Sequence, residues 1–200
     1  MLLYLWGIFI MTVILEKGES VPLKRSLSKV KVGMGWNLRR TLGEEFDLDV
    51  SCFMLNDAGK VRGEADFIFY NHLESPCGSV KHLGDNRNGE GEGDDEQILV
   101  DLSLVPEDVE SLVFTATIYK ASQRGQHFGQ VDDSFIRLVD MKDGCEIAKY
   151  ELKEDACTST AFVFGELYRC LGDWKFRAVG HGYDFSLGGL AQTYGISDIG

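Results

Sequence analysis

The 200-residue sequence lacks the residue patterns by which hydrolases and metalloenzymes are usually recognised. Its four histidines are scattered without metal-ligand spacing, and no G-x-S-x-G nucleophile motif is present. The five cysteines contain no C-x-x-C pair, which argues against a zinc site and against a disulfide framework. The cysteine pattern instead indicates reduced thiols, as in a cytoplasmic protein. These absences leave no base or nucleophile from which a catalytic mechanism could be written.

Basic residues are also scarce, since 20 Lys and Arg face 32 Asp and Glu and give a net charge of −12. Such a charge argues against nucleic acid and anionic membrane surfaces as partners, because both would repel the chain. The longest apolar run, residues 1–15, is shorter than the roughly 18–20 residues of a membrane span. It also lacks the basic start and the small-residue cleavage site of a secretory signal.

We interpret residues 1–10 as an apolar extension, as an added strand, or as sequence preceding the true start of the protein. A membrane anchor is the alternative. Residues 11–200 are expected to form a single domain, because the chain shows no long linker and no internal repeat.

What the sequence does contain is a succession of short segments in which apolar and polar residues alternate. Residues 46–55 show this pattern most clearly, with Phe46, Leu48 and Val50 on one face and Asp47 and Asp49 on the other. About ten such segments, separated by turn residues, predict an all-β sandwich of two mainly antiparallel sheets. One or two short helices are expected, at residues 106–110 and 184–191. Two glycines within the strand at residues 30–36 predict a bulge or a close backbone approach.

Residues 84–96 are the most distinctive stretch, because acidic and amide side chains alternate there with four glycines. So many carboxylates repel one another in a closed loop unless a hard cation is present. Calcium takes six to eight oxygen ligands in irregular geometry, so this stretch predicts a calcium loop. It does not follow the EF-hand pattern, because Arg87 and Glu90 stand where that loop needs an oxygen ligand and a glycine. The alternative interpretation is a solvated acidic linker.

Two further places could supply oxygen ligands. Asp47 and Asp49 project from one face of an extended segment, about 6.5–7 Å apart. The alternative is two carboxylates on a solvated sheet face. Asn71 follows an apolar strand and offers an amide oxygen, and its alternative role is turn capping.

The same carboxylates leave an enzyme as the alternative function. Paired Asp and Glu residues can hold magnesium for a hydrolase or a phosphotransferase. Against this function, no basic residue other than Arg87 stands near them to bind a phosphate.

Seven segments in order resemble the TerD family of bacterial tellurite-resistance and stress-response proteins, over a span of about residues 11–195. The segments are residues 32–36, 46–51, 65–71, 84–96, 125–131, 164–169 and 174–180. The resemblance implies a cytoplasmic β-sandwich that binds two calcium ions and acts with other stress-response proteins of the same system. Calcium would order the acidic loop for a partner. One departure is Asn37, which stands where family members usually carry Asp.

By this resemblance the metal-binding role is carried onto nine positions. They are Asp47, Asp49, Asn71, Asp85, Asn86, Gly89 (through its carbonyl), Asp94, Asp95 and Glu96.

Overall fold

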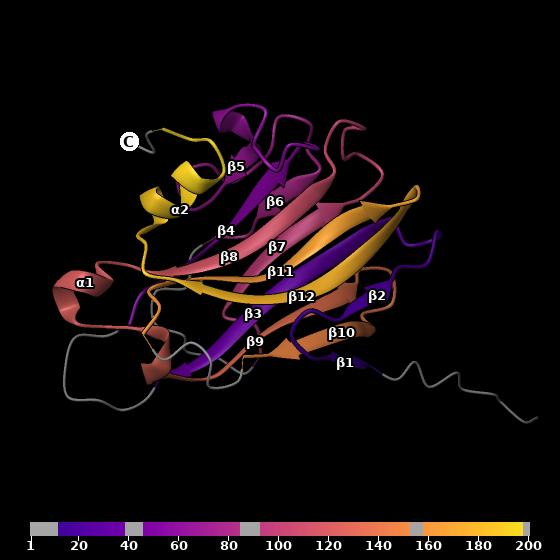
Figure 1. The fold of residues 1–200 in the computed structure, drawn as a ribbon. Helices are drawn as coiled ribbons and strands as arrows, with labels where there is room; N and C mark the ends of the chain where they lie inside the picture. The colour runs from indigo at the N-terminus through magenta and orange to yellow at the C-terminus, as the bar shows by residue number, and fades with distance from the viewer. Residues whose placement is uncertain (1–11, 39–45, 85–92, 153–157, 198–200) are drawn as a thin grey trace, which may run out of the picture.

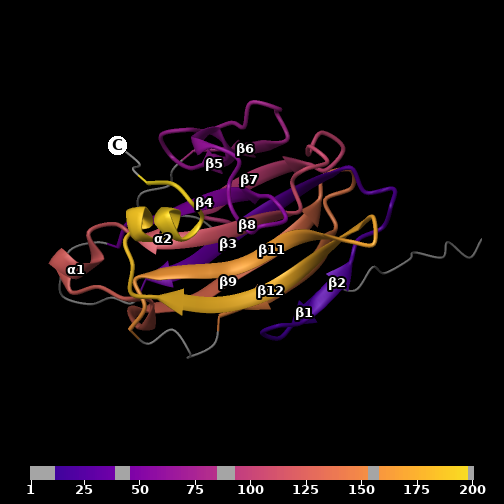
Figure 2. The same ribbon diagram turned by 45° about the horizontal axis from the view of Figure 1, so that its top comes forward.

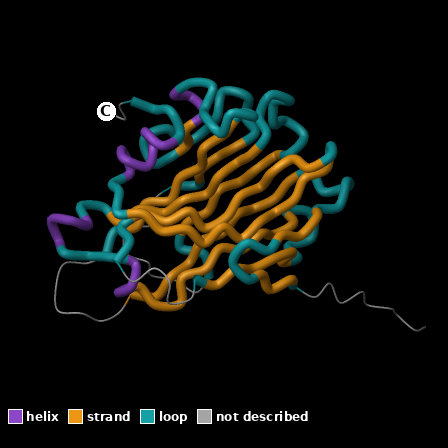
Figure 3. The backbone as a smooth tube through the Cα atoms, viewed as in Figure 1, coloured by secondary structure: helices purple, strands orange, loops and turns teal. Residues whose placement is uncertain are grey.

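The chain folds into two six-stranded sheets packed face to face, as Figures 1 and 2 show. The structure is a computed structural model that describes residues 12–38, 46–84, 93–152 and 158–197. Strands dominate the described chain, and the helices are few and short (Figure 3). The predicted all-β sandwich is confirmed. Residues 1–10, and the loop positions Asp85, Asn86 and Gly89, lie outside the described residues.

Sheet A carries the acidic stretch and has one parallel pair. Its strands, in spatial order, are β1 (Val13–Leu15), β10 (Glu146–Glu151), β9 (Val131–Asp140), β3 (Lys29–Leu38), β7 (Glu96–Asp101) and β6 (Val80–His82). The β1–β10 pair is parallel, and the other described pairs of this sheet are antiparallel.

Sheet B is antiparallel at each described pair. Its strands, in spatial order, are β2 (Ser20–Pro22), β12 (Asp173–Tyr183), β11 (Ala161–Cys170), β8 (Ser111–Ile118), β4 (Leu48–Leu55) and β5 (Phe67–Ile68).

The main core lies between the sheets, because alternate residues of each strand point inward. In β7, Glu96, Ile98 and Val100 are buried, while the residues between them are half-buried. Large side chains of both sheets meet in this layer, among them Met34, Phe114, Phe162, Phe176 and Ile136, each less than 3% exposed. Burying each such side chain stabilises the fold by about 1.5–3 kcal/mol before the entropy cost is counted.

A second, smaller core lies on the outer face of sheet B. Helix α2 (Leu187–Thr193) covers Phe53 and Val113 with Leu190 and Ala191, which are both 0% exposed. The helix begins where Ser186 Oγ accepts a hydrogen bond from the Gly189 N–H at 3.3 Å. Figure 1 shows it in yellow beside β4 and β8. The short helix expected within residues 184–191 is therefore present.

The other expected helical segment is not a helix. Residues 106–110 form a turn that is closed by a hydrogen bond from Val109 N–H to Pro106 O, at 3.1 Å. Short helices occur instead at α1 (Ala121–Arg124) and in the single 3₁₀ turns Glu64–Asp66 and Phe128–Gln130. Neither α-helix of the described chain has the length and the apolar character that a membrane crossing needs.

Candidate metal centre

The two glycines of β3 make room for the end of the acidic stretch. A Cβ atom at Gly33 would overlap the carboxylate of Asp94, and one at Gly35 would lie 2.7 Å from Gly93 O. The main chain of residues 93–95 therefore lies directly against β3, and Asp95 N–H donates to Met34 O at 2.8 Å. The close backbone approach predicted from the glycine spacing is confirmed.

Asp94 lies on the outer face of sheet A, where its charge is compensated by two cations. Its carboxylate accepts a hydrogen bond from Arg137 Nε at 2.6 Å and pairs with Lys31 Nζ at 3.0 Å. The Asp94 side chain is 0% exposed. The hydrogen bond to Asp94 raises the pKa of Arg137, although burial opposes the shift. Asp94 therefore anchors the acidic stretch to β3 and β9 through ion pairs.

Asp95 has a different environment. One of its oxygens accepts a hydrogen bond from the Trp36 N–H at 2.8 Å. Burial raises the pKa of Asp95, the neighbouring charge of Asp94 raises it further, and the Trp36 N–H opposes both. No Lys, Arg or His among the described residues forms an ion pair with it. This carboxylate would gain from a bound cation, because a cation would offset both burial and the repulsion from Asp94.

Glu96 points inward and lies beside a histidine that joins the two sheets. His82 Nε2 is 3.4 Å from Glu96 Oε2, and both side chains are 1% exposed. The same nitrogen is 3.2 Å from the carbonyl oxygen of Val50 in β4, and the Gly84 N–H donates to His82 Nδ1 at 3.1 Å. Gly84, the first residue of the acidic stretch, is therefore tied, through His82, to β4 of the opposite sheet.

The other predicted ligands among the described residues, Asp47, Asp49 and Asn71, lie on or beside sheet B. Leu48 and Val50 face the main core and Phe53 faces the second core, so Asp49 projects from the outer face of this sheet. Asp47 precedes β4, and its carbonyl oxygen accepts a hydrogen bond from the Tyr119 N–H at 2.8 Å. Asn71 is exposed, in the turn that the His72 N–H closes on Phe69 O.

The structure thus does not bring the predicted ligands into one cluster within the part of the chain that it describes. Asp94 and Asp95 lie with sheet A, whereas Asp47 and Asp49 lie with sheet B. Over the described ranges, no group of three His, Cys, Asp or Glu side chains is placed to hold a metal ion.

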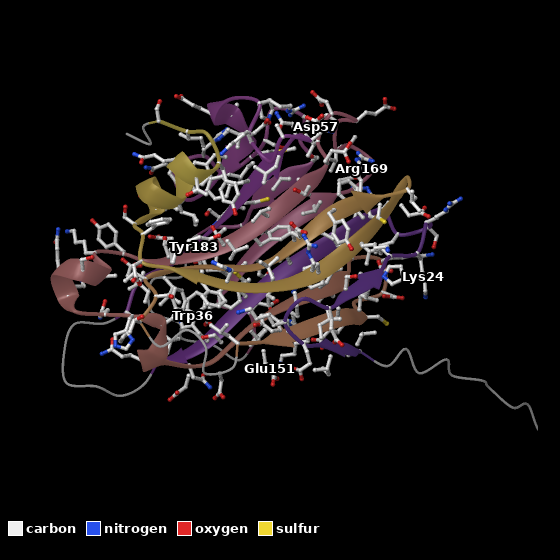
Figure 4. The ribbon with its side chains drawn as sticks, viewed as in Figure 1. Lys24, Trp36, Asp57, Glu151, Arg169 and Tyr183 are labelled. Carbon is white, nitrogen blue, oxygen red and sulfur yellow. The ribbon has the colours of Figure 1, made fainter. Side chains whose placement is uncertain are left out.

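A cleft of about 620 Å³ opens at the end of β3, where β9 begins and β10 ends. Figure 4 labels Trp36 and Glu151, which both line it. Asn37 Nδ2 donates a hydrogen bond across the cleft wall to Asp133 Oδ2, at 2.9 Å. The full described lining is Trp36, Asn37, Gly93, Asp95, Asp133, Ser134, Phe135, Lys149, Glu151 and Leu152.

Asp133 is not among the nine ligands predicted from the sequence. The acidic pair at residues 132 and 133, directly before an alternating segment, was a sign that Asp133 could belong to a site. The residues that face this pair across the sheet could not be known from the sequence. Chemically, the cleft offers carboxylate, amide, hydroxyl and carbonyl oxygens, which are ligands for a hard cation such as calcium. Asp95 fits such an ion, whereas Asp94 already has its charge balanced by Arg137 and Lys31.

Comparisons of the sequence with a family model and with individual proteins point to the same family. The family model described as "TerD domain" matches residues 11–194. The chain is 53% identical over 190 residues to "Tellurium resistance protein TerD" of Serratia marcescens, covering 94% of this chain and 99% of that one. It is 47% identical to "General stress protein 16U" of Bacillus subtilis (strain 168), covering 93% and 98%.

Among solved structures, a homologue of the telluride resistance protein (TerD) from Streptomyces coelicolor A3(2) is similar, with a TM-score of 0.66 and 18% identity. The match covers 81% of this chain and 94% of that one. At this identity, the likeness supports the fold alone.

Proposed function

Since the chain belongs to the TerD family, whose members are named for tellurium resistance and stress response, we propose that it acts in such a response by binding calcium. Two ions would bind through the acidic stretch and the Asp47–Asp49 strand. Calcium would order residues 84–96 and so create a surface for another protein of the same system. We expect the protein to act in the cytoplasm, which suits the free thiols of Cys52, Cys77, Cys145 and Cys170.

One observation carries this proposal. Asp95 is a partly buried carboxylate next to a second carboxylate, and no cation among the described residues pairs with it. Its pKa is raised by burial and by Asp94, so the folded chain holds this charge at a cost. A calcium ion at Asp95 would remove that cost, which links calcium binding to stability.

Asp94 would then have a supporting role. Its ion pairs with Arg137 and Lys31 fix the main chain at Asp95, so the neighbouring carboxylate is held in place before any ion arrives. Pre-ordering of a ligand lowers the entropy that is lost on binding.

Thermal unfolding with added calcium tests this function. We expect millimolar calcium to raise the melting temperature of the native chain more than magnesium does, because the site offers irregular oxygen geometry. Asp95→Asn should reduce the rise, whereas Asp57→Asn, at an exposed turn, should keep it. A melting temperature that calcium leaves unchanged in the native chain would rule the proposal out.

The magnesium-dependent hydrolase has no observation in its favour. The described lining of the cleft contains no histidine and no cysteine, and none of the relatives named above bears an enzyme's name. An assay for magnesium-dependent turnover of nucleotides and phosphoesters separates this function from calcium binding.

A further inference from the structure

Strand β1 forms an edge of sheet A, at the margin of the sandwich beside β10 (Figure 1). It pairs with β10 on one side only. Over the described residues, no other segment forms a backbone hydrogen bond with Val13–Leu15. The outward N–H and C=O groups of such an edge strand are a template on which a further strand can pair.

The side chains of β1 do not oppose that pairing. Leu15 points into the main core and is 4% exposed, whereas Val13 and Ile14 are 40% and 58% exposed. Residues 12–15 contain no charged side chain and no proline. Proteins usually protect an edge strand with a charge, a proline, a bulge or a covering segment. The β1 edge has none of the first two, and its outward side chains are apolar.

The edge of sheet B at β2 is protected by a proline. The Leu23 N–H donates to Trp174 O in β12 at 2.9 Å, so Leu23 turns its backbone groups toward the sheet. Backbone groups alternate in direction along an antiparallel pair, so the neighbouring Pro22 faces outward. Because proline has no N–H, it cannot complete the hydrogen bonds of a further strand.

The two remaining edges are covered or very short. At β6, residues 73–75 lie alongside the strand, and the Ser75 N–H donates to Val80 O at 2.9 Å. Strand β5 has only two residues, and His72 Nδ1 donates to Phe67 O at 2.9 Å. Of the four sheet edges in the described chain, β1 alone is therefore open and apolar.

We propose that β1 pairs in the antiparallel direction with β1 of a second copy of this chain, about a two-fold axis at Ile14. A second copy is the occupant because an open edge needs another open edge, and β1 is the one that the described chain offers. In this register, Ile14 faces Ile14 of the second copy, and Val13 faces Leu15. The two A sheets become one continuous sheet, and the inference does not depend on calcium.

The expected dimer is weak. Three residues from each copy bury less than the roughly 1,200–2,000 Å² of a standard interface, so we expect a dissociation constant of roughly 1 μM–1 mM. Each copy carries a net charge of −12, so added salt should strengthen the association by screening the repulsion. Sedimentation of the full chain should show a mass that rises toward two chains with concentration and with salt. A chain that stays monomeric over this range, with salt present, overturns the proposal.

Ile14→Glu is the decisive variant. Ile14 pairs with Lys149 of β10, so the new carboxylate suits the folded monomer. In the dimer, two carboxylates would face each other across the axis. We expect an association at least tenfold weaker, with the melting temperature of the dilute monomer kept. Met141→Glu is the matched control, because Met141 is 46% exposed on the turn after β9 and should not affect association. An Ile14→Glu chain that associates like the native chain would show that β1 is not the contact.

Ile14→Cys tests the register. Directly opposed residues of an antiparallel pair have Cα atoms about 4.5–5.5 Å apart, which suits a disulfide. Mild oxidation should therefore join two copies through position 14, and peptide mass spectrometry separates this bond from those of the native cysteines. Leu104→Cys is the control, because Leu104 is similarly exposed, at 50%, but lies on a loop. Equal cross-linking of the two variants would indicate random collision and refute the two-fold pairing.

A chain that begins at Met11 identifies the segment responsible. Residues 1–10 are apolar and precede β1, so they are a second possible cause of association. The shortened chain should form the dimer as the full chain does, and Ile14→Glu should weaken both. If only the full chain associates, residues 1–10 cause the association and the β1 pairing is wrong.

Discussion

The carboxylate of Asp94 lies over the backbone of Gly33, in the space that any side chain at position 33 would need. The acidic stretch is therefore anchored by shape as well as by charge. A glycine in the middle of a strand normally weakens it, and here it admits a buried ion pair on the outer face of sheet A.

Gly33→Ala should destabilise the protein by about 1–3 kcal/mol, because the methyl group would displace a carboxylate held by Arg137 and Lys31. Urea unfolding measures the effect. Gly63→Ala is the control, since Gly63 has an extended φ of −178° and nothing lies within 4 Å of an added Cβ. Equal effects of the two substitutions would contradict the close approach.

Asp94→Asn should cost about 1–3 kcal/mol, because Arg137 and Lys31 would lose the charge that balances them. The cations are 28% and 22% exposed, so solvent limits the loss. Denaturant titration of Asp94→Asn, Arg137→Met and the double variant measures the coupling. If the two single effects simply add, the ion pair has no role in stability.

Asp95→Asn should stabilise the calcium-free protein at neutral pH, by a few tenths of a kcal/mol given its partial exposure. The folded-state pKa of Asp95 is raised by burial and by Asp94, so its ionised form disfavours folding. The penalty is full above that pKa, shrinks as the pH falls below it, and is gone once the pH lies below the unfolded-state pKa. Unfolding curves at several pH values should therefore converge for the two proteins in acid. A variant less stable than the native chain at neutral pH would contradict this account.

Cys77 should react with iodoacetamide severalfold faster than Cys145 near pH 7.5. Burial raises the pKa of Cys77, but hydrogen bonds from the Ser75 and Ser79 hydroxyls outweigh it and lower the pKa overall. The pKa of Cys145 is raised, first by its hydrogen bond with Asp143. More thiolate at a given pH means faster alkylation, which peptide mass spectrometry can follow. Ser79→Ala should slow Cys77 alone, and equal rates at the two cysteines would refute the assignment.

Leu190→Ala should destabilise the fold by about 2–4 kcal/mol, because this fully buried side chain joins α2 to the second core. Leu171→Asn is the matched control, since Leu171 is 98% exposed with a φ of 54°. That change should be neutral or slightly stabilising. Thermal melts of both variants decide whether α2 is part of the cooperative unit. A loss below about 0.5 kcal/mol for Leu190→Ala would mean that α2 detaches independently.

Most strands could be predicted from the sequence because alternation is a local signal. The segment at residues 46–55 contains β4, and the segment at residues 30–36 lies within β3. Strand β2 was missed, because the three residues Ser20–Pro22 are too few to show an alternation of apolar and polar side chains. Helix α1 was missed for a similar reason, since four residues cannot show a helical repeat.

The site was predictable only where its chemistry is local. The acidic stretch and the close approach of Gly33 and Gly35 could be read from composition and spacing. The pairing of Asp94 with Arg137, 43 residues away, depends on which strands are neighbours. Asp133 owes its conformation to the register between β3 and β9, which no pattern within β9 reveals.

The parallel pairing of β1 with β10 has a consequence for synthesis on the ribosome. Val13–Leu15 can complete sheet A only after residues 148–150 have emerged, and Ser20–Pro22 in sheet B must wait for residues 175–177. Closing such long loops is entropically costly and slows folding. Residues 13–15 and 20–22 therefore remain unpaired until late in translation, and their apolar side chains stay exposed throughout that interval.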